Sequence, residues 1–137
     1  MRRSDRADEL RLVDIMVTPD ERVAWIEITP HTLDRARASF NDVGSVANSL
    51  CTIRGVDVGL TFEAREADKT MVEIRSRGRV DVGTIARELG GGGHHNASGC
   101  TLPLSIHEAR SKVLDRITQA VNSCPLIASS DTLANSR

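Results

Sequence analysis

The segment from residue 56 to residue 62 constrains the fold more than any other. Its apolar side chains alternate strictly with the residues between them: Val56, Val58, Leu60 and Phe62. Such alternation predicts a β-strand with one buried face. A polar loop over 63–69 and a second strand over about 70–76 follow, with Val72 and Ile74 on one side. The two strands are therefore predicted to pair as an antiparallel hairpin.

Further elements are predicted on both sides of this hairpin. A strand over 23–29 would bury Ala24, Ile26 and Ile28 on one face. Helical spacing and capping residues predict four helices, at about 30–39, at about 43–54, from Asp81 to Leu89, and onward from a capping box of Ser105 and Glu108. Strands interleaved with helices indicate an α/β fold, here a mixed β-sheet flanked by helices.

The 137 residues are enough for one domain with one modest core. We expect this domain to span residues 22–122. In residues 1–21, Leu10, Val13 and Val17 have helical spacing, which predicts a linker helix or the stub of an interdomain connection. Residues 123–137 are rich in small polar residues, and we expect a loose C-terminal tail.

Composition restricts the kind of ligand. The net charge of −1 argues against a large footprint on a long polyanion, because such binding normally requires a basic surface. With only Trp25, Phe40 and Phe62 as aromatic residues, the chain can hardly build a base-stacking platform. These facts favour a short ligand held by its phosphates. The sequence has no apolar run of membrane-spanning length and no signal-peptide pattern, so a cytoplasmic protein is expected.

Four consecutive glycines, Gly90 to Gly93, stand directly before His94. Gly90 fits the left-handed position that ends a helix. Gly91, Gly92 and Gly93 need another reason, since each ordered glycine costs about 0.5 to 1 kcal/mol relative to alanine. Their main-chain N–H groups could form an anion-binding nest. A plain turn or flexible linker is the alternative.

A second candidate site lies at the end of the strand over 70–76. Arg75, Ser76 and Arg77 offer guanidinium and hydroxyl donors that suit phosphate, although a solvated hairpin end is the alternative. The strand end and the glycine run are one short helix apart, so they can lie side by side. His94 is expected to hydrogen-bond to substrate, and Asn96 either to bond a base or to cap a turn. No set of metal ligands is expected around His94 and His95.

Taken together, three stretches resemble one family. They are Arg75-Ser76-Arg77, the helix start Val80-Asp81-Val82, and the run GGGGHHNASG. They resemble the DHH-associated domain of DHH-family phosphoesterases, and within it the branch of bacterial oligoribonucleases and adenosine-3′,5′-bisphosphate phosphatases (nanoRNases). The resemblance extends over roughly residues 22–121.

The resemblance implies a substrate-binding role. Arg75, Ser76, Arg77 and the glycines Gly91 to Gly93 would hold phosphate, with His94 and Asn96 also contacting substrate. The substrates would be short oligoribonucleotides and nucleotide 3′,5′-bisphosphates. The family's chemistry uses two Mn²⁺ ions held by a preceding DHH domain, which would be the partner of this chain in a parent protein that could be a homodimer.

The Asp-His-His signature of that catalytic domain does not occur in this sequence. We therefore expect no catalytic residue, metal or other cofactor in this chain, which would be a fragment or a solitary binding domain. The main alternative is a stand-alone nucleotide or RNA-binding module. The related domain of alanyl-tRNA synthetases is disfavoured, because a tRNA binder should be more basic.

Overall fold

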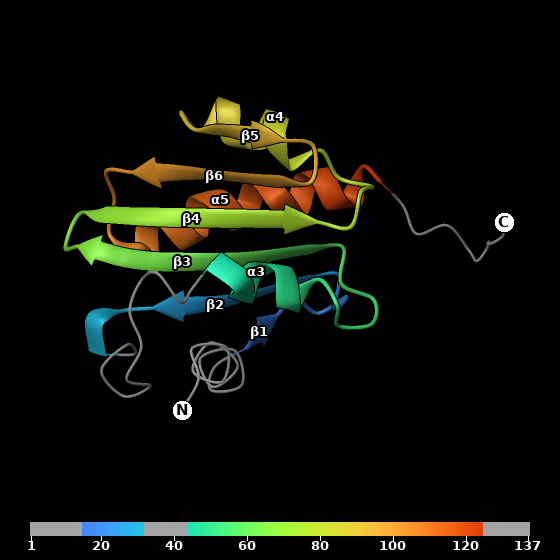
Figure 1. Ribbon diagram of the computed structural model, residues 1–137, viewed down its shortest axis with the longest axis horizontal. Helices are drawn as coiled ribbons and strands as arrows, with labels where there is room; N and C mark the ends of the chain where they lie inside the picture. Colours follow the sequence, from blue (N-terminus) through green and yellow to red (C-terminus); the bar gives the residue numbers. More distant parts are fainter. Residues whose placement is uncertain (1–14, 32–43, 125–137) are drawn as a thin grey trace, which may run out of the picture.

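The computed structural model describes residues 15–31 and 44–124. They form one six-stranded sheet in the order β1-β2-β3-β4-β6-β5 (Figure 1). The strands are β1 (Met16–Val17), β2 (Val23–Ile28), β3 (Val58–Glu66), β4 (Lys69–Ser76), β5 (Gly92–His94) and β6 (Ala97–Leu102). The helices are α3 (Gly44–Leu50), α4 (Val82–Glu88) and α5 (Ile106–Asn122). Because β2 and β3 are parallel while the other neighbours are antiparallel, the predicted mixed sheet is confirmed.

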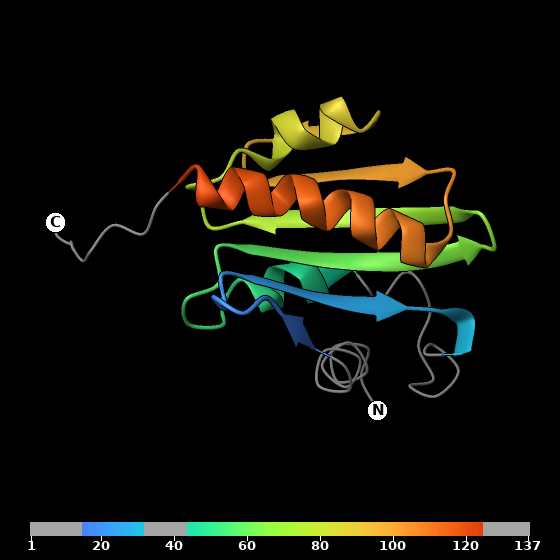
Figure 2. The ribbon, with the colours of Figure 1, turned by 180° about the vertical axis from the view of Figure 1, so that it is seen from behind.

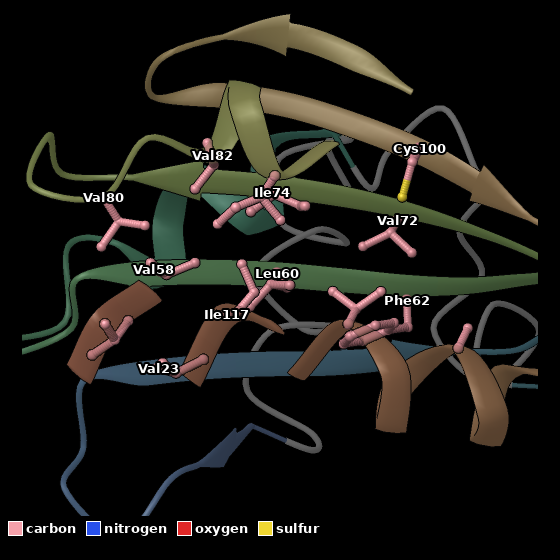
Figure 3. Close-up of a cluster of buried hydrophobic side chains, with 14 of the residues drawn as sticks. Val23, Val58, Leu60, Phe62, Val72, Ile74, Val80, Val82, Cys100 and Ile117 are labelled. Atoms are coloured by element: carbon pink, nitrogen blue, oxygen red, sulfur yellow. The ribbon is translucent and has the colours of Figure 1, made fainter. Parts of the chain in front are cut away.

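One face of the sheet packs against α5 (Figure 2). The predicted capping box opens this helix: the Ser105 hydroxyl accepts from the Glu108 amide, and the Glu108 carboxylate accepts from the Ser105 amide. The helix buries a stripe at intervals of four residues: Ala109, Val113, Ile117 and Val121. The stripe meets the inward side chains of β3 and β4 in the core shown in Figure 3. Full burial of each large aliphatic side chain contributes about 1.5 to 3 kcal/mol.

On the opposite face α3 packs mainly over β3, with further contacts to β4 and β2 (Figure 1). Val46 and Leu50 of α3 join a second core with Ala24, Ile26 and Ile28. Gly59 permits this contact, because a Cβ there would lie 2.8 Å from both the Ala47 carbonyl oxygen and the Leu50 Cβ. The prediction that the strand at 56–62 has one buried face is therefore wrong. Residues 58 to 63 of β3 are buried on both sides.

Several element boundaries also differ from the prediction. β3 runs from Val58 to Glu66, so the polar loop expected over 63–69 is reduced to a turn between β3 and β4. The helix expected over 43–54 ends at Leu50, and turns that include Gly55, at φ +89°, occupy the rest. Burial of Glu63 depends on packing that local spacing does not encode, whereas the turns after Leu50 are closed by local main-chain hydrogen bonds, such as the Ile53 amide to the Leu50 carbonyl.

The helix expected within residues 1–21 is not found in the part of that segment that the structure describes, which begins at residue 15. Met16 and Val17 form β1, which pairs antiparallel with β2. Pro30 and His31 begin a helical turn as predicted. The remainder of the helix expected over 30–39, and most of the tail expected over 123–137, lie outside the described residues. The domain boundaries at 21 and 122 stay predictions. Among the described helices, none has the length and apolar character needed to cross a lipid bilayer.

Candidate functional site

The glycine run begins as the end of α4. Gly90 has φ +90°, and its amide donates to the Arg87 carbonyl at 3.1 Å. The Gly91 amide donates to the Ala86 carbonyl at 2.7 Å. These two bonds are the pair that closes a helix in the Schellman motif. The predicted helix-ending role of Gly90 is confirmed.

The next three residues, Gly92 to His94, form the edge strand β5 against β6. A Cβ on Gly91 would lie 2.1 Å from the Gly99 carbonyl oxygen, and one on Gly93 would lie 2.5 Å from the Ser98 Cα. These two glycines therefore allow β5 to approach β6. A Cβ on Gly92 would meet no protein atom within 4 Å. The run is an ordered turn and strand, and its binding of phosphate stays a prediction.

His94 and Arg75 are aligned across the sheet. His94 is opposite Ala97 of β6, and Ala97 is opposite Arg75 of β4. Directly opposed residues present their side chains on the same face. The strand end and the glycine run are therefore not immediate neighbours: β6 separates them by two strand spacings, about 10 Å. On the α3 side, α3 reaches the edge of β4, and in Figure 1 no described helix covers β6 and β5. We call the surface formed by β4, β6 and β5 on that side the open face.

Arg75 is held in a defined orientation on the open face. Its Nη1 donates to the Ile74 carbonyl at 3.0 Å and to the Ser98 carbonyl at 3.2 Å. Its side chain is 19% exposed. Within residues 15–31 and 44–124 the structure gives Nε and Nη2 no hydrogen-bond partner. The guanidinium thus keeps one donor edge for a ligand, in the fork geometry that suits two phosphate oxygens.

The other residues expected at the strand end have different positions. The buried Ser76 hydroxyl donates to the Val80 carbonyl at 2.7 Å and accepts from the Gly78 amide at 2.9 Å, so it closes the turn after β4. Arg77 is exposed, and its amide donates to the Asp57 carbonyl. Asn96 is exposed in the β5–β6 turn, and its carbonyl accepts from the Ser76 amide. All three lie at the same end of the sheet as Arg75.

Sequence reasoning missed two sets of contacts that fix this end. His95 Nε2 lies 2.6 Å from the Gly78 carbonyl oxygen, which joins the β5–β6 turn to the loop after β4. The buried Asp57 carboxylate pairs with Arg22 at 2.7 Å and with Arg79 at 3.0 Å. A hydrogen bond from Arg22 to the Cys124 carbonyl adds the end of α5 to the same cluster. The partners are up to 102 residues apart, so no local pattern could have revealed them.

The described part of the chain offers no metal centre. No three of its His, Cys, Asp or Glu side chains converge closely enough to hold an ion. A two-metal centre needs several convergent carboxylates and imidazoles. The described residues therefore do not form a site for the two Mn²⁺ ions, which the family resemblance places in a preceding DHH domain.

Comparison with known proteins adds the family. The model of the DHHA1 domain matches residues 23–124. The bifunctional oligoribonuclease and PAP phosphatase NrnA of Thermus thermophilus is 34% identical over 93 residues, which are 67% of this chain and 28% of that protein. The chain thus spans less than a third of the length of this relative.

Solved structures share the fold. An exopolyphosphatase-related protein from Bacteroides fragilis superposes with a TM-score of 0.72 at 24% identity, over 88% of this chain and 34% of that one. The C-Ala domain of Aquifex aeolicus alanyl-tRNA synthetase superposes with a TM-score of 0.57 at 14% identity, over 79% of this chain and 97% of that one. The family match covers most of the chain and includes every predicted site residue, so this chain belongs to the DHHA1 domain family, the DHH-associated domains of phosphoesterases, close to the nanoRNase branch.

Proposed function

We propose that this chain is the substrate-binding part of a phosphoesterase that acts on short oligoribonucleotides and nucleotide 3′,5′-bisphosphates. The catalytic centre, with its Mn²⁺ ions, would belong to a DHH domain that faces the open face across a cleft. The relative from Thermus thermophilus, whose name gives oligoribonuclease and PAP phosphatase activities, supports this substrate class.

One observation carries the proposal, namely the geometry of Arg75. Its Nη1 is fixed by two main-chain carbonyls, so little side-chain entropy remains to be lost when the opposite edge binds phosphate. His94, which is exposed and has no recorded side-chain partner among the described residues, lies in the same row on the same face. If the phosphate of a nucleotide binds Arg75, the rest of the nucleotide can therefore extend along the open face.

The test is a titration of wild type and Arg75→Ala with adenosine-3′,5′-bisphosphate. Losing a bidentate contact to a charged group costs about 1.5 to 3 kcal/mol, so we expect about ten- to hundredfold weaker binding. Arg116→Ala is the matched control: it removes the same charge from α5, where Arg116 pairs only with Glu88 among the described residues. Equal affinities of wild type and Arg75→Ala would mean that the Arg75 end is a solvated hairpin end.

A second test addresses the missing chemistry. We expect the pure 137-residue chain to leave bis-p-nitrophenyl phosphate and short RNA intact in the presence of added Mn²⁺, because the described residues provide no metal-ligand set. Turnover by the pure chain that a chelator abolishes would overturn this expectation. It would assign the chain an activity of its own.

A further inference from the structure

Glu73 lies inside the proposed binding surface but has no part in the proposed phosphate contacts. It precedes Arg75 by two residues on β4, and its carboxylate Oε1 is 3.2 Å from Arg75 Nη1. It is opposite Gly99 of β6, and Gly99 is opposite Gly92 of β5. The Glu73 side chain is 20% exposed. A negative charge therefore lies beside the Nη1 side of the guanidinium whose Nε and Nη2 edge is proposed to bind phosphate.

This carboxylate is not required to hold Arg75. The Ile74 and Ser98 carbonyls already accept from Nη1, and a partly exposed ion pair contributes little to stability. Its effect on a ligand is larger, because a like charge close to a bound anion opposes binding. A phosphate ion at Arg75 would bear this repulsion with only its own P–OH group to donate to the carboxylate.

A nucleotide can offset the repulsion, because its sugar hydroxyls and base amino groups are hydrogen-bond donors and a carboxylate is purely an acceptor. The surface beside Glu73 has room for them. Gly99 and Gly92 carry no side chain, and the position of a Cβ on Gly92 is open for 4 Å. This glycine row lies two residues, about 7 Å, along the strands from the row of Arg75. A nucleotide whose phosphate meets Arg75 can lay its sugar or base over the glycines, next to Glu73.

We propose that Glu73 makes the Arg75 site selective for nucleotides over inorganic phosphate. Its charge repels a bare anion, and its oxygens accept a hydrogen bond from a sugar hydroxyl or a base amino group. Selectivity of this kind combines a repulsive element with an attractive one. The inference rests on the proposed function, since it assumes that Arg75 binds the phosphate.

The experiment compares inorganic phosphate with adenosine 5′-monophosphate as ligands of the full chain, by NMR titration. The variants are Glu73→Gln, which removes the charge and keeps an acceptor, and Glu73→Ala, which removes both. Glu66→Gln is the control for net charge, because Glu66 lies at the far end of β3 with its side chain 72% exposed. Thermal melting of each variant confirms that it is folded. If Glu73→Gln does not fold, Glu73→Ala alone tests the proposed selectivity.

We expect Glu73→Gln to bind phosphate about tenfold more tightly, the equivalent of 1.4 kcal/mol of relieved repulsion. Its affinity for the nucleotide should change by less than about threefold. Glu73→Ala should gain the same for phosphate, whereas for the nucleotide the loss of one hydrogen bond offsets most of the relieved repulsion, so its affinity should rise by about twofold at most. Glu66→Gln should leave the ratio of the two affinities unchanged.

If the ratio of the phosphate affinity to the nucleotide affinity is the same in wild type and in both Glu73 variants, the inference is overturned. This holds whether the two affinities change together or stay constant. If Arg75→Ala had weakened binding in that case, the proposed function would survive and only the selectivity of Glu73 would be lost. A wild-type chain that binds neither ligand would overturn both.

Discussion

The two faces of the β4–β6 pair differ, although the same two strands make both of them. Successive residues along each strand point to opposite faces. Toward α5 the strands present large apolar side chains, among them Val72, Ile74 and Leu102, each at most 3% exposed. Toward the open face the same strands present a charged pair, Glu73 and Arg75, together with the small Ala97 and Gly99. One face supplies packing, and the other presents main chain and charge.

The difference shows how one strand can serve two purposes. Burial of the inner side chains fixes strand register, because a slip of one residue would turn every side chain to the wrong face. With the register fixed from one side, the other side can carry residues that strands normally avoid. Glycine weakens a strand interior and often marks a close approach of ligand or backbone. Gly99 illustrates the backbone case, since a Cβ there would lie 2.9 Å from the Val72 carbonyl oxygen.

The largest effect is expected on the packed face. Ile117 is fully buried between α5 and the sheet, so Ile117→Ala should lower the free energy of unfolding by about 3 to 4 kcal/mol through lost burial and the cavity left behind. Urea unfolding measures this loss. Thr118→Ala, one residue along the same helix and exposed, should stay within about 0.5 kcal/mol. Similar costs at the two positions would contradict the assignment of the core.

Two neighbouring glycines, Gly91 and Gly92, permit the same comparison between a packed position and an open one. Gly91→Ala should lower the free energy of unfolding by about 2 to 3 kcal/mol, because its Cβ would meet main-chain atoms of β6 that cannot move aside singly. Gly92→Ala should leave stability within about 0.5 kcal/mol, since the φ of Gly92 is not positive and the space is open. Chemical denaturation of both variants in parallel measures the contrast.

The binding data should reverse that order. If the surface over Gly92 receives the nucleotide, a methyl group there removes ligand space, and Gly92→Ala should bind adenosine-3′,5′-bisphosphate at least about tenfold more weakly while melting like wild type. Titration and melting on the same sample measure both quantities. A Gly92→Ala protein that binds as wild type does would indicate that this glycine serves only as an unhindered edge residue.

The sequence predicted the elements whose signals are local. Asp81 caps α4 by accepting from the Thr84 amide, and Ser105 with Glu108 caps α5, both as expected. The alternation in β4 gave the correct buried side. Expectations failed where strand pairing and packing decide: Val17 pairs with Ala24 in a strand, and β3 continues through the buried Glu63. No local rule predicts a buried glutamate in a strand.

For the candidate site, the sequence identified residue types better than roles. Arg75 and His94 do share a face, but only because the hairpin of β5 and β6 sets their register. Ser76 has the hydroxyl that a phosphate site needs, yet the turn after β4 already uses it. The orientation of Arg75 depends on the Ser98 carbonyl 23 residues away. Such roles follow from strand pairing, which the spacing of one sequence does not fix.

The smallest effect concerns Glu63, which lies on the α3 side of β3 and is 2% exposed. Burial raises the pKa of its carboxyl group above the ordinary value, and the hydrogen bond from Arg65 only partly opposes this. The native state therefore binds the proton more tightly than the unfolded chain does. The stability that follows is fully present below the ordinary pKa of glutamate and is lost as the pH rises through the raised native pKa.

Glu63→Gln should thus remove a cost that exists only where the carboxylate is charged. We expect the variant to be more stable than wild type at pH 8, by less than about 1 kcal/mol, because the Arg65 ion pair offsets part of the burial cost. The advantage should shrink as the pH falls to 4. Arg65 is 35% exposed, and its Nη2 also lies 3.2 Å from Met71 Sδ, so it keeps a contact when Glu63 is neutral. Urea unfolding from pH 4 to pH 8 measures the difference, with Glu66→Gln as the exposed control. A difference that grows toward acid would mean that the Arg65 pair outweighs burial.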